Sequence, residues 1–90
     1  MKLGQAVMTR GINTAVASNE DFSMFVTESI FRYCRQDWGD LCDGDKRMND
    51  SAVKNNDDRI VAHYNSVHGD IYIITEWDRS VTTILFTHEY

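Results

Sequence analysis

Two strand-like segments, residues 71–77 and 81–87, constrain the fold of this chain more than any other feature. Both are rich in β-branched and aromatic residues, which pack well on a pleated sheet. Residues 78–80 between them predict a short turn, and a third strand-like segment, 59–64, precedes them across a loop that contains Gly69. We therefore expect a three-stranded antiparallel meander.

A helix is predicted before this sheet. Apolar residues within 22–33 recur every three or four positions, which is typical of one face of an amphipathic helix. Ser18 or Asn19 is the expected N-cap. A second helical stretch is expected from about residue 43 to 54, whereas the pattern at 12–17 is ambiguous.

The chain is expected to form a single α+β domain, residues 1–90. We expect a three- or four-stranded antiparallel sheet packed against two helices, the fourth strand being a weak candidate at 5–10. Side chains alternate along 71–77, so one face carries Tyr72 and Ile74. That face is an interface in one interpretation and is covered by the second helix in the other. The chain has no proline, so edge strands lack one common protection against pairing with another chain.

The charge of the chain bears on its partners. The formal net charge is −5, and the nine Lys and Arg residues are scattered along the sequence. Phosphate binding needs clustered bases, so the pattern argues against direct nucleic-acid binding and favours a basic protein partner. No signal peptide or apolar run of about 20 residues is present, which argues against a membrane segment. We expect a cytoplasmic protein in which Cys34 and Cys42 are reduced thiols.

An acidic segment lies before the strands. It holds seven aspartates between Asp37 and Asp58 but only three bases. One interpretation is an electronegative surface for a basic partner, with Trp38 as an exposed aromatic beside it; the other is a solvated helix with acids at its positive end. The candidate partner-binding residues are Trp38, Asp40, Asp43, Asp45, Asp50, Tyr72 and Glu76.

The turn at residues 78–80 is the densest polar cluster between strong strands. Arg79 and Ser80 could bind a phosphate there and, with His63 or His88 as a base, cleave RNA. The favoured interpretation is structural. In it, Arg79 pairs with Asp78 or Glu76, and Ser80 or Asp78 caps the turn.

Metal and cofactor sites have no support in the sequence. The acidic segment lacks the glycine and glutamate positions of a calcium loop. The cysteines and histidines lack the short paired spacing of a zinc site. No phosphate-binding loop, nucleophile elbow or dinucleotide fingerprint occurs, so we expect no cofactor and no catalytic residue.

Several segments carry a resemblance. They are residues 37–41 (Asp-Trp-Gly-Asp-Leu), 45–50, 59–64, 73–85 and the final Glu89-Tyr90. Together they resemble a family of small bacterial proteins carried on plasmids, prophages and other mobile elements, often labelled plasmid-related and sometimes labelled as a restriction subunit. The resemblance spans roughly residues 4–90. It implies a mobile-element origin, which is typical of small acidic anti-defence proteins.

Three functional hypotheses follow. The first is a non-enzymatic mobile-element protein, such as an anti-CRISPR or anti-restriction inhibitor, that uses its acidic surface to block a basic host or defence protein. The second is a small ribonuclease or phosphate-binding domain that uses Arg79, Ser80 and a histidine. The third is a structural or regulatory homodimer.

Overall fold

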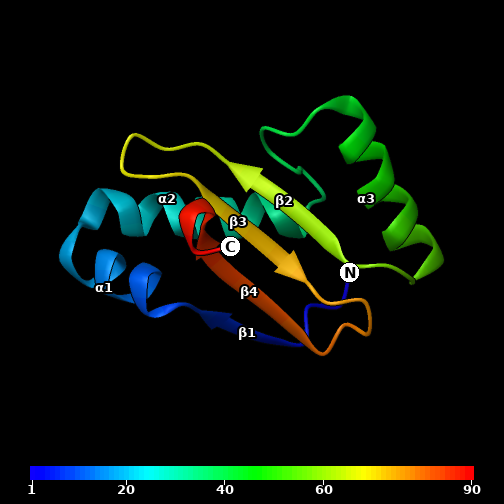
Figure 1. Ribbon diagram of the computed structural model, residues 1–90, viewed down its shortest axis with the longest axis horizontal. Helices are drawn as coiled ribbons and strands as arrows, with labels where there is room; N and C mark the ends of the chain where they lie inside the picture. The colour runs from blue at the N-terminus through cyan, green and yellow to red at the C-terminus, as the bar shows by residue number, and fades with distance from the viewer.

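A four-stranded sheet organises the fold in the computed structural model, which describes residues 1–90. The elements in chain order are β1 (Gln5–Met8), α1 (Arg10–Ser18), α2 (Glu20–Cys34), α3 (Asp43–Asn55), β2 (Ile60–Tyr64), β3 (Ile71–Thr75), β4 (Val81–Phe86) and a short 3₁₀ turn, η1 (Thr87–Glu89). The strands lie in the order β1-β4-β3-β2 (Figure 1). The expected α+β class and the C-terminal antiparallel meander are confirmed.

Two details of the expected fold were wrong. The N-terminal strand is part of the sheet, but β1 runs parallel to β4, with Gln5 opposite Val81 and Met8 opposite Ile84. Parallel neighbours need a long crossover connection, and the chain between β1 and β4 provides one through three helices and two strands. There are also three helices rather than two. The ambiguous stretch forms α1, because the Thr9 hydroxyl accepts a hydrogen bond from the Ile12 amide at 3.3 Å and caps the helix.

Asn19 separates the first two helices. Its backbone is extended, with φ −140°, and its side-chain oxygen accepts a hydrogen bond from the Phe22 amide at 3.1 Å. This is the N-cap predicted for the amphipathic helix. Glu20 and Asp21 follow in the first turn, where carboxylates interact favourably with the helix dipole.

The core lies between α2 and one face of the sheet, here called the inner face. α2 passes behind the strands in Figure 1. The apolar face of α2 supplies buried residues, as the three- and four-residue spacing predicted. The fully buried aromatic and β-branched residues of this core include Phe22, Val26, Tyr33, Ile60, Tyr64, Ile71, Ile73 and Ile84.

A chain of hydroxyl groups crosses this core. The Thr82 hydroxyl donates to the Leu3 carbonyl at 2.7 Å. Thr82 has a single proton, so its oxygen accepts from Thr75 at 2.7 Å, and Thr75 in turn accepts from the Tyr33 phenol at 2.7 Å. Each of these three buried hydroxyls therefore donates to the next group in one direction, from α2 through two strands to the segment before β1.

The opposite, outer face of the sheet is only partly covered. α3 stands beside the edge strand β2 rather than over the sheet (Figure 1). Tyr72 and Val61 are half-buried on this face, whereas Ile74 is buried. Neither interpretation of this face was complete, because α3 covers its margin and leaves part of it accessible.

Candidate functional site

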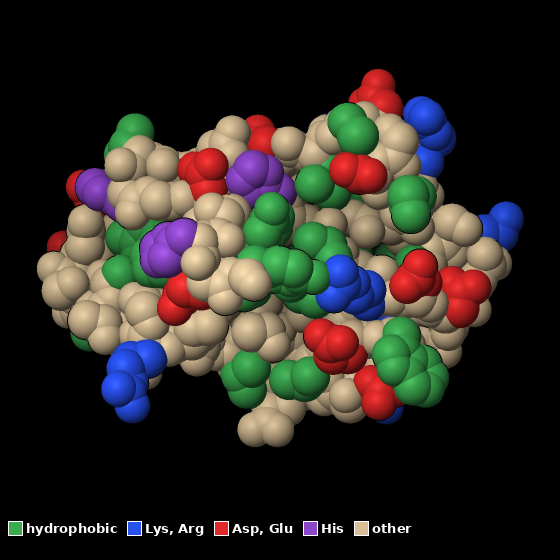
Figure 2. Space-filling model, in the orientation of Figure 1, with side chains coloured by type: hydrophobic (Ala, Val, Ile, Leu, Met, Phe, Trp, Pro, Cys, Tyr) green, Lys and Arg blue, Asp and Glu red, His purple; other side chains and the backbone are tan.

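The acidic side chains predicted from the sequence lie on and around α3. We call the exposed set the acidic belt; it consists of Asp40, Asp43, Asp45, Asp50, Asp57 and Asp58. Figure 2 shows hydrophobic side chains gathered in the middle of the outer face, with acidic and basic side chains toward the α3 side. The belt is therefore accessible to a partner.

Trp38 is not part of that surface. Only 2% of it is exposed, its ring lies edge-on against Tyr33 with centroids 5.4 Å apart, and its indole nitrogen donates to Asp50 at 2.8 Å. The expectation of an exposed tryptophan was wrong. The ring joins the core between α2 and α3, and its one polar atom is satisfied by the belt residue Asp50. A polar sequence context around Trp38 gave no sign of this burial.

Three aromatic residues are exposed, Phe31 on α2, Trp77 and Tyr90. Trp77 is 68% exposed at the turn between β3 and β4, and Tyr90 is the last residue. The turn lies beside the belt, because one guanidinium nitrogen of Arg79 binds the carbonyls of both Trp77 and Asp58. An exposed aromatic does therefore flank the acids, but it is a different tryptophan from the one expected.

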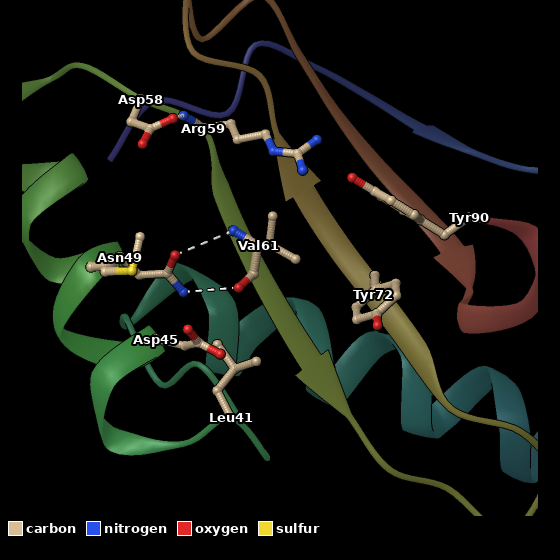
Figure 3. A pocket seen from close by; sticks show the side chains of 9 residues that line it. Leu41, Asp45, Asn49, Asp58, Arg59, Val61, Tyr72 and Tyr90 are labelled. Carbon is tan, nitrogen blue, oxygen red and sulfur yellow. Dashed lines mark hydrogen bonds between the residues drawn. The ribbon is translucent and has the colours of Figure 1, made fainter.

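A groove of about 410 Å³ runs between α3 and the outer face of β2 and β3 (Figure 3). Its lining consists of Leu41, Asp45, Met48, Asn49, Asp58, Arg59, Val61, Tyr72 and Tyr90. Two residues predicted as partner-binding, Asp45 and Tyr72, lie on opposite sides of it. The other predicted residues do not line it: Asp40, Asp43, Asp50 and Glu76 lie outside, and Trp38 is buried.

The floor of the groove is built by Asn49 and Val61. The Asn49 side-chain nitrogen donates to the Val61 carbonyl at 2.9 Å, and its oxygen accepts from the Val61 amide at 3.3 Å (Figure 3). Asn49 is buried on α3. The pair fixes α3 against β2 and sets the width of the groove.

One wall of the groove is aromatic. The rings of Tyr72 and Tyr90 meet edge-on with centroids 5.6 Å apart, and the His63 ring lies 5.3 Å from Tyr72. The Arg59 guanidinium sits 5.7 Å from the centre of the Tyr90 ring, in cation–π geometry. This wall already accommodates one cationic side chain from the protein itself.

The other wall is apolar and acidic. Leu41 and the exposed Met48 supply apolar surface, and Asp45 and Asp58 supply carboxylates. Arg59 is the single base of the lining. Sequence reasoning missed Met48, Arg59 and Tyr90, because they come from three separate segments and share no spacing pattern.

The turn at residues 78–80 has a structural role. Arg79 is 6% exposed, and its guanidinium donates to the backbone carbonyls of Asp58, Glu76, Trp77 and Ala52 at 2.7–3.2 Å. It makes no carboxylate pair, so the pairing predicted with Asp78 or Glu76 was wrong. Arg79 instead joins the turn to α3 and to the loop before β2.

The predicted cap of this turn is confirmed. One carboxylate oxygen of Asp78 accepts from the Ser80 amide at 3.1 Å and from the Ser80 hydroxyl at 2.6 Å. These bonds hold the pKa of Asp78 below its usual value. Ser80 is thereby engaged by a carboxylate, and His63 lies toward the other end of β2, opposite Tyr72. His88 lies in η1, after the end of β4 that is away from the turn. The residues proposed for phosphate chemistry are therefore not gathered at one site.

The remaining chemical groups are dispersed. No three His, Cys, Asp or Glu side chains lie close enough together to hold a metal ion, and both cysteines are free thiols. None of the helices has the length and apolar character needed to cross a membrane.

Comparison of the chain with protein-family models, with curated proteins and with solved structures finds no match.

Proposed function

We propose that the chain is a non-enzymatic interaction protein of a mobile element, which binds a basic segment of a host or defence protein in the groove between α3 and β2. The observation that carries the proposal is the pairing of an aromatic wall with carboxylates across one groove. Asp45 faces the Tyr72 side of the groove, and the acidic belt continues beyond it. Bound in this way, the chain would act as an anti-CRISPR or anti-restriction inhibitor.

The chemistry of the groove fits arginine best. A guanidinium can stack on an aromatic face while it donates two parallel hydrogen bonds to a carboxylate. The wall of Tyr72 and Tyr90 offers the ring, and Asp45 and Asp58 offer the carboxylates. The contact of Arg59 with Tyr90 is an example of this stacking within the chain itself.

Electrostatics adds to this preference. The belt places six exposed carboxylates on and around α3, and the three bases of the same segment leave it a net negative charge. A surface of net negative charge raises the association rate of a basic partner. Defence nucleases bind nucleic acid through basic surfaces, and such a surface is the complement of this belt. The resemblance to mobile-element proteins makes a defence protein the natural target.

A ribonuclease or phosphate-binding role has weaker support. Its cation, Arg79, is buried, and its two terminal nitrogens are bound to four carbonyls. A phosphate that used these nitrogens would have to displace those bonds.

Two measurements test the proposal. The first is an NMR titration with an arginine-rich peptide, alongside a peptide of the same length with glutamate in place of arginine. We expect only the basic peptide to bind, with shifts at Asp45, Tyr72 and Tyr90. Tyr72→Ala and Asp45→Asn should each weaken binding several-fold, whereas Glu28→Gln, an exposed carboxylate change on α2, should leave it unchanged. Equal binding of both peptides, or an unaffected Asp45→Asn variant, would contradict the groove.

The second measurement addresses the biological role. The chain is expressed in bacteria that carry a CRISPR or restriction system, and phage plating is compared with that for the Tyr72→Ala variant. We expect plating to recover with the wild-type chain only. Recovery that is equal with Tyr72→Ala would remove the groove from the mechanism, and no recovery in any system would remove the anti-defence role.

A further inference from the structure

The two edges of the sheet are finished differently. On the β2 edge, the His63 amide donates to the Trp38 carbonyl at 3.3 Å, and the His63 carbonyl accepts from the Asp40 amide at 2.7 Å. The Asp40 carboxylate then accepts from the Asn65 amide at 2.9 Å. With Asn49 on Val61, every outward backbone group along this edge has a partner within the chain. β2 is therefore closed to a further strand.

The β1 edge has no such closure. The amides of Gln5 and Thr9 donate to carbonyls of the β4 side, Ser80 at 3.0 Å and Ile84 at 3.1 Å. Backbone direction alternates along a strand, so the amides and carbonyls of Ala6 and Met8 point away from β4. No loop or side chain of the molecule binds them. In Figure 1, β1 forms the lower border of the sheet with no element beneath it.

Apart from the shortness of β1, which has four residues, this edge lacks the usual protections against strand addition. β1 contains no charged residue, no proline and no bulge. Ala6 and Met8 are exposed, and Val7 between them is half-buried. The strand thus presents a short, neutral, unpaired row of donors and acceptors.

We propose that a second copy of this chain pairs with β1, antiparallel, about a two-fold axis at Val7. In this register Ala6 of each copy lies opposite Met8 of the other, and the two residues exchange both backbone hydrogen bonds. Within β1, only Ala6 and Met8 have amides and carbonyls that point outward. A two-fold axis at Val7 lets each of these residues pair with the other one in the second copy, so all four groups of each copy are hydrogen-bonded. The two four-stranded sheets then join into one of eight strands.

Charge does not oppose a second copy as the occupant. The strand β1 holds only uncharged residues, so the register centred on Val7 places no like charges across the paired strands. The two-fold axis is normal to the sheet, so both helical layers lie on one side. The groove lies at the opposite edge, beside β2, and stays open in both copies. The dimer is thus independent of the proposed function.

A four-residue strand pair is small compared with stable interfaces, which bury about 1,600 Å². We therefore expect a dimer that dissociates on dilution. Analytical ultracentrifugation over a concentration series should show the mass rising from one chain toward two. Ala6→Pro should abolish this rise, because it removes only an outward amide and leaves the bonds to β4 intact. Ala6→Ser keeps the amide and is the matched control, expected to dimerise like the wild type.

A charge swap tests the register and does not depend on how well the proline variant folds. Val7→Lys and Val7→Glu each place like charges face to face at the axis, so each alone should be monomeric. A mixture of the two should form a mixed dimer. A wild-type chain that stays monomeric up to millimolar concentration would overturn the proposal. Dimers that persist in Ala6→Pro, or in both single charge variants, would also overturn it.

Discussion

The side-chain amide of Asn49 binds Val61 in the way that a neighbouring strand would. It donates to the Val61 carbonyl at 2.9 Å and accepts from the Val61 amide at 3.3 Å. A helical side chain thereby ends the sheet on this side, and the same contact forms the floor of the groove. Stability and site geometry are coupled through this one residue.

Asn49→Ala should lower the free energy of unfolding by about 1–3 kcal/mol, because it leaves two backbone groups of Val61 without partners. Chemical denaturation measures the loss, and hydrogen exchange should show faster exchange of the Val61 amide. Asn55→Ala, on the exposed side of the same helix, is the control and should change stability by less than about 0.5 kcal/mol. Equal effects of the two changes would contradict the role assigned to Asn49.

Arg79→Met should lower the free energy of unfolding by about 3 kcal/mol. The change keeps most of the side-chain volume but removes every bond to the four backbone carbonyls. Arg79 also has φ 60°, a left-handed conformation that costs energy in a non-glycine residue. Thermal unfolding gives the measurement, and Arg35→Met, an exposed arginine at the end of α2, should be nearly neutral. A neutral Arg79→Met would show that the bonds do not support the fold.

Two glycines should respond in opposite directions to alanine. Gly39 has φ +76°, and an added Cβ would overlap the carbonyl oxygen of His63. Gly39→Ala should therefore lower the free energy of unfolding by about 2 kcal/mol or more. Gly44 lies in the first turn of α3, where an added Cβ would meet no atom closer than 4.0 Å, so Gly44→Ala should raise the free energy of unfolding by about 0.5 kcal/mol. The melting temperatures of the two variants should shift apart, and a shift of the same sign would contradict the geometry at one of the positions.

Stability should fall at alkaline pH because burial raises the pKa of two phenols, those of Tyr33 and Tyr64. The pKa of Tyr33 rises from 10.0 to about 12. The folded protein thus keeps the proton where the unfolded chain has released it. The stabilisation is complete below about pH 10 and is lost as the pH rises toward about 12.

Denaturation at about pH 8 and about pH 11 measures this loss. Tyr33→Phe should fall less steeply between the two, after an initial cost of about 1 kcal/mol for the hydrogen bond. Tyr90→Phe, which changes an exposed phenol, should follow the wild type. Parallel curves for all three proteins would rule out Tyr33 as a source.

Local patterns in the sequence were enough to predict most helices and strands, but not how all the strands pair. Strand periodicity and the cap at Asn19 are local signals, and the structure confirms both. The direction of β1 depends on a crossover through three helices, which no local pattern encodes. The ambiguous helix α1 is too short to show a clear apolar period.

In the candidate site, too, features set by local sequence were predicted correctly, whereas features set by tertiary contacts were not. The exposure of the aspartates followed from their polarity, but Trp38 was misplaced because its burial depends on contacts from α2 and α3. Arg79 was expected to find a carboxylate and instead binds carbonyls that only tertiary folding brings together. The groove combines side chains from α3, β2, β3 and the last residue, so no contiguous sequence motif could predict it.

The closure of β2 by Asn49, Trp38 and Asp40 also limits how large an assembly of this protein can grow. A sheet with two open edges can add copies head to tail without end, and such addition leads to fibres. Here only β1 can receive a strand. Any assembly built by strand addition between copies is therefore complete at two chains, and the protein has a built-in stop against polymerisation.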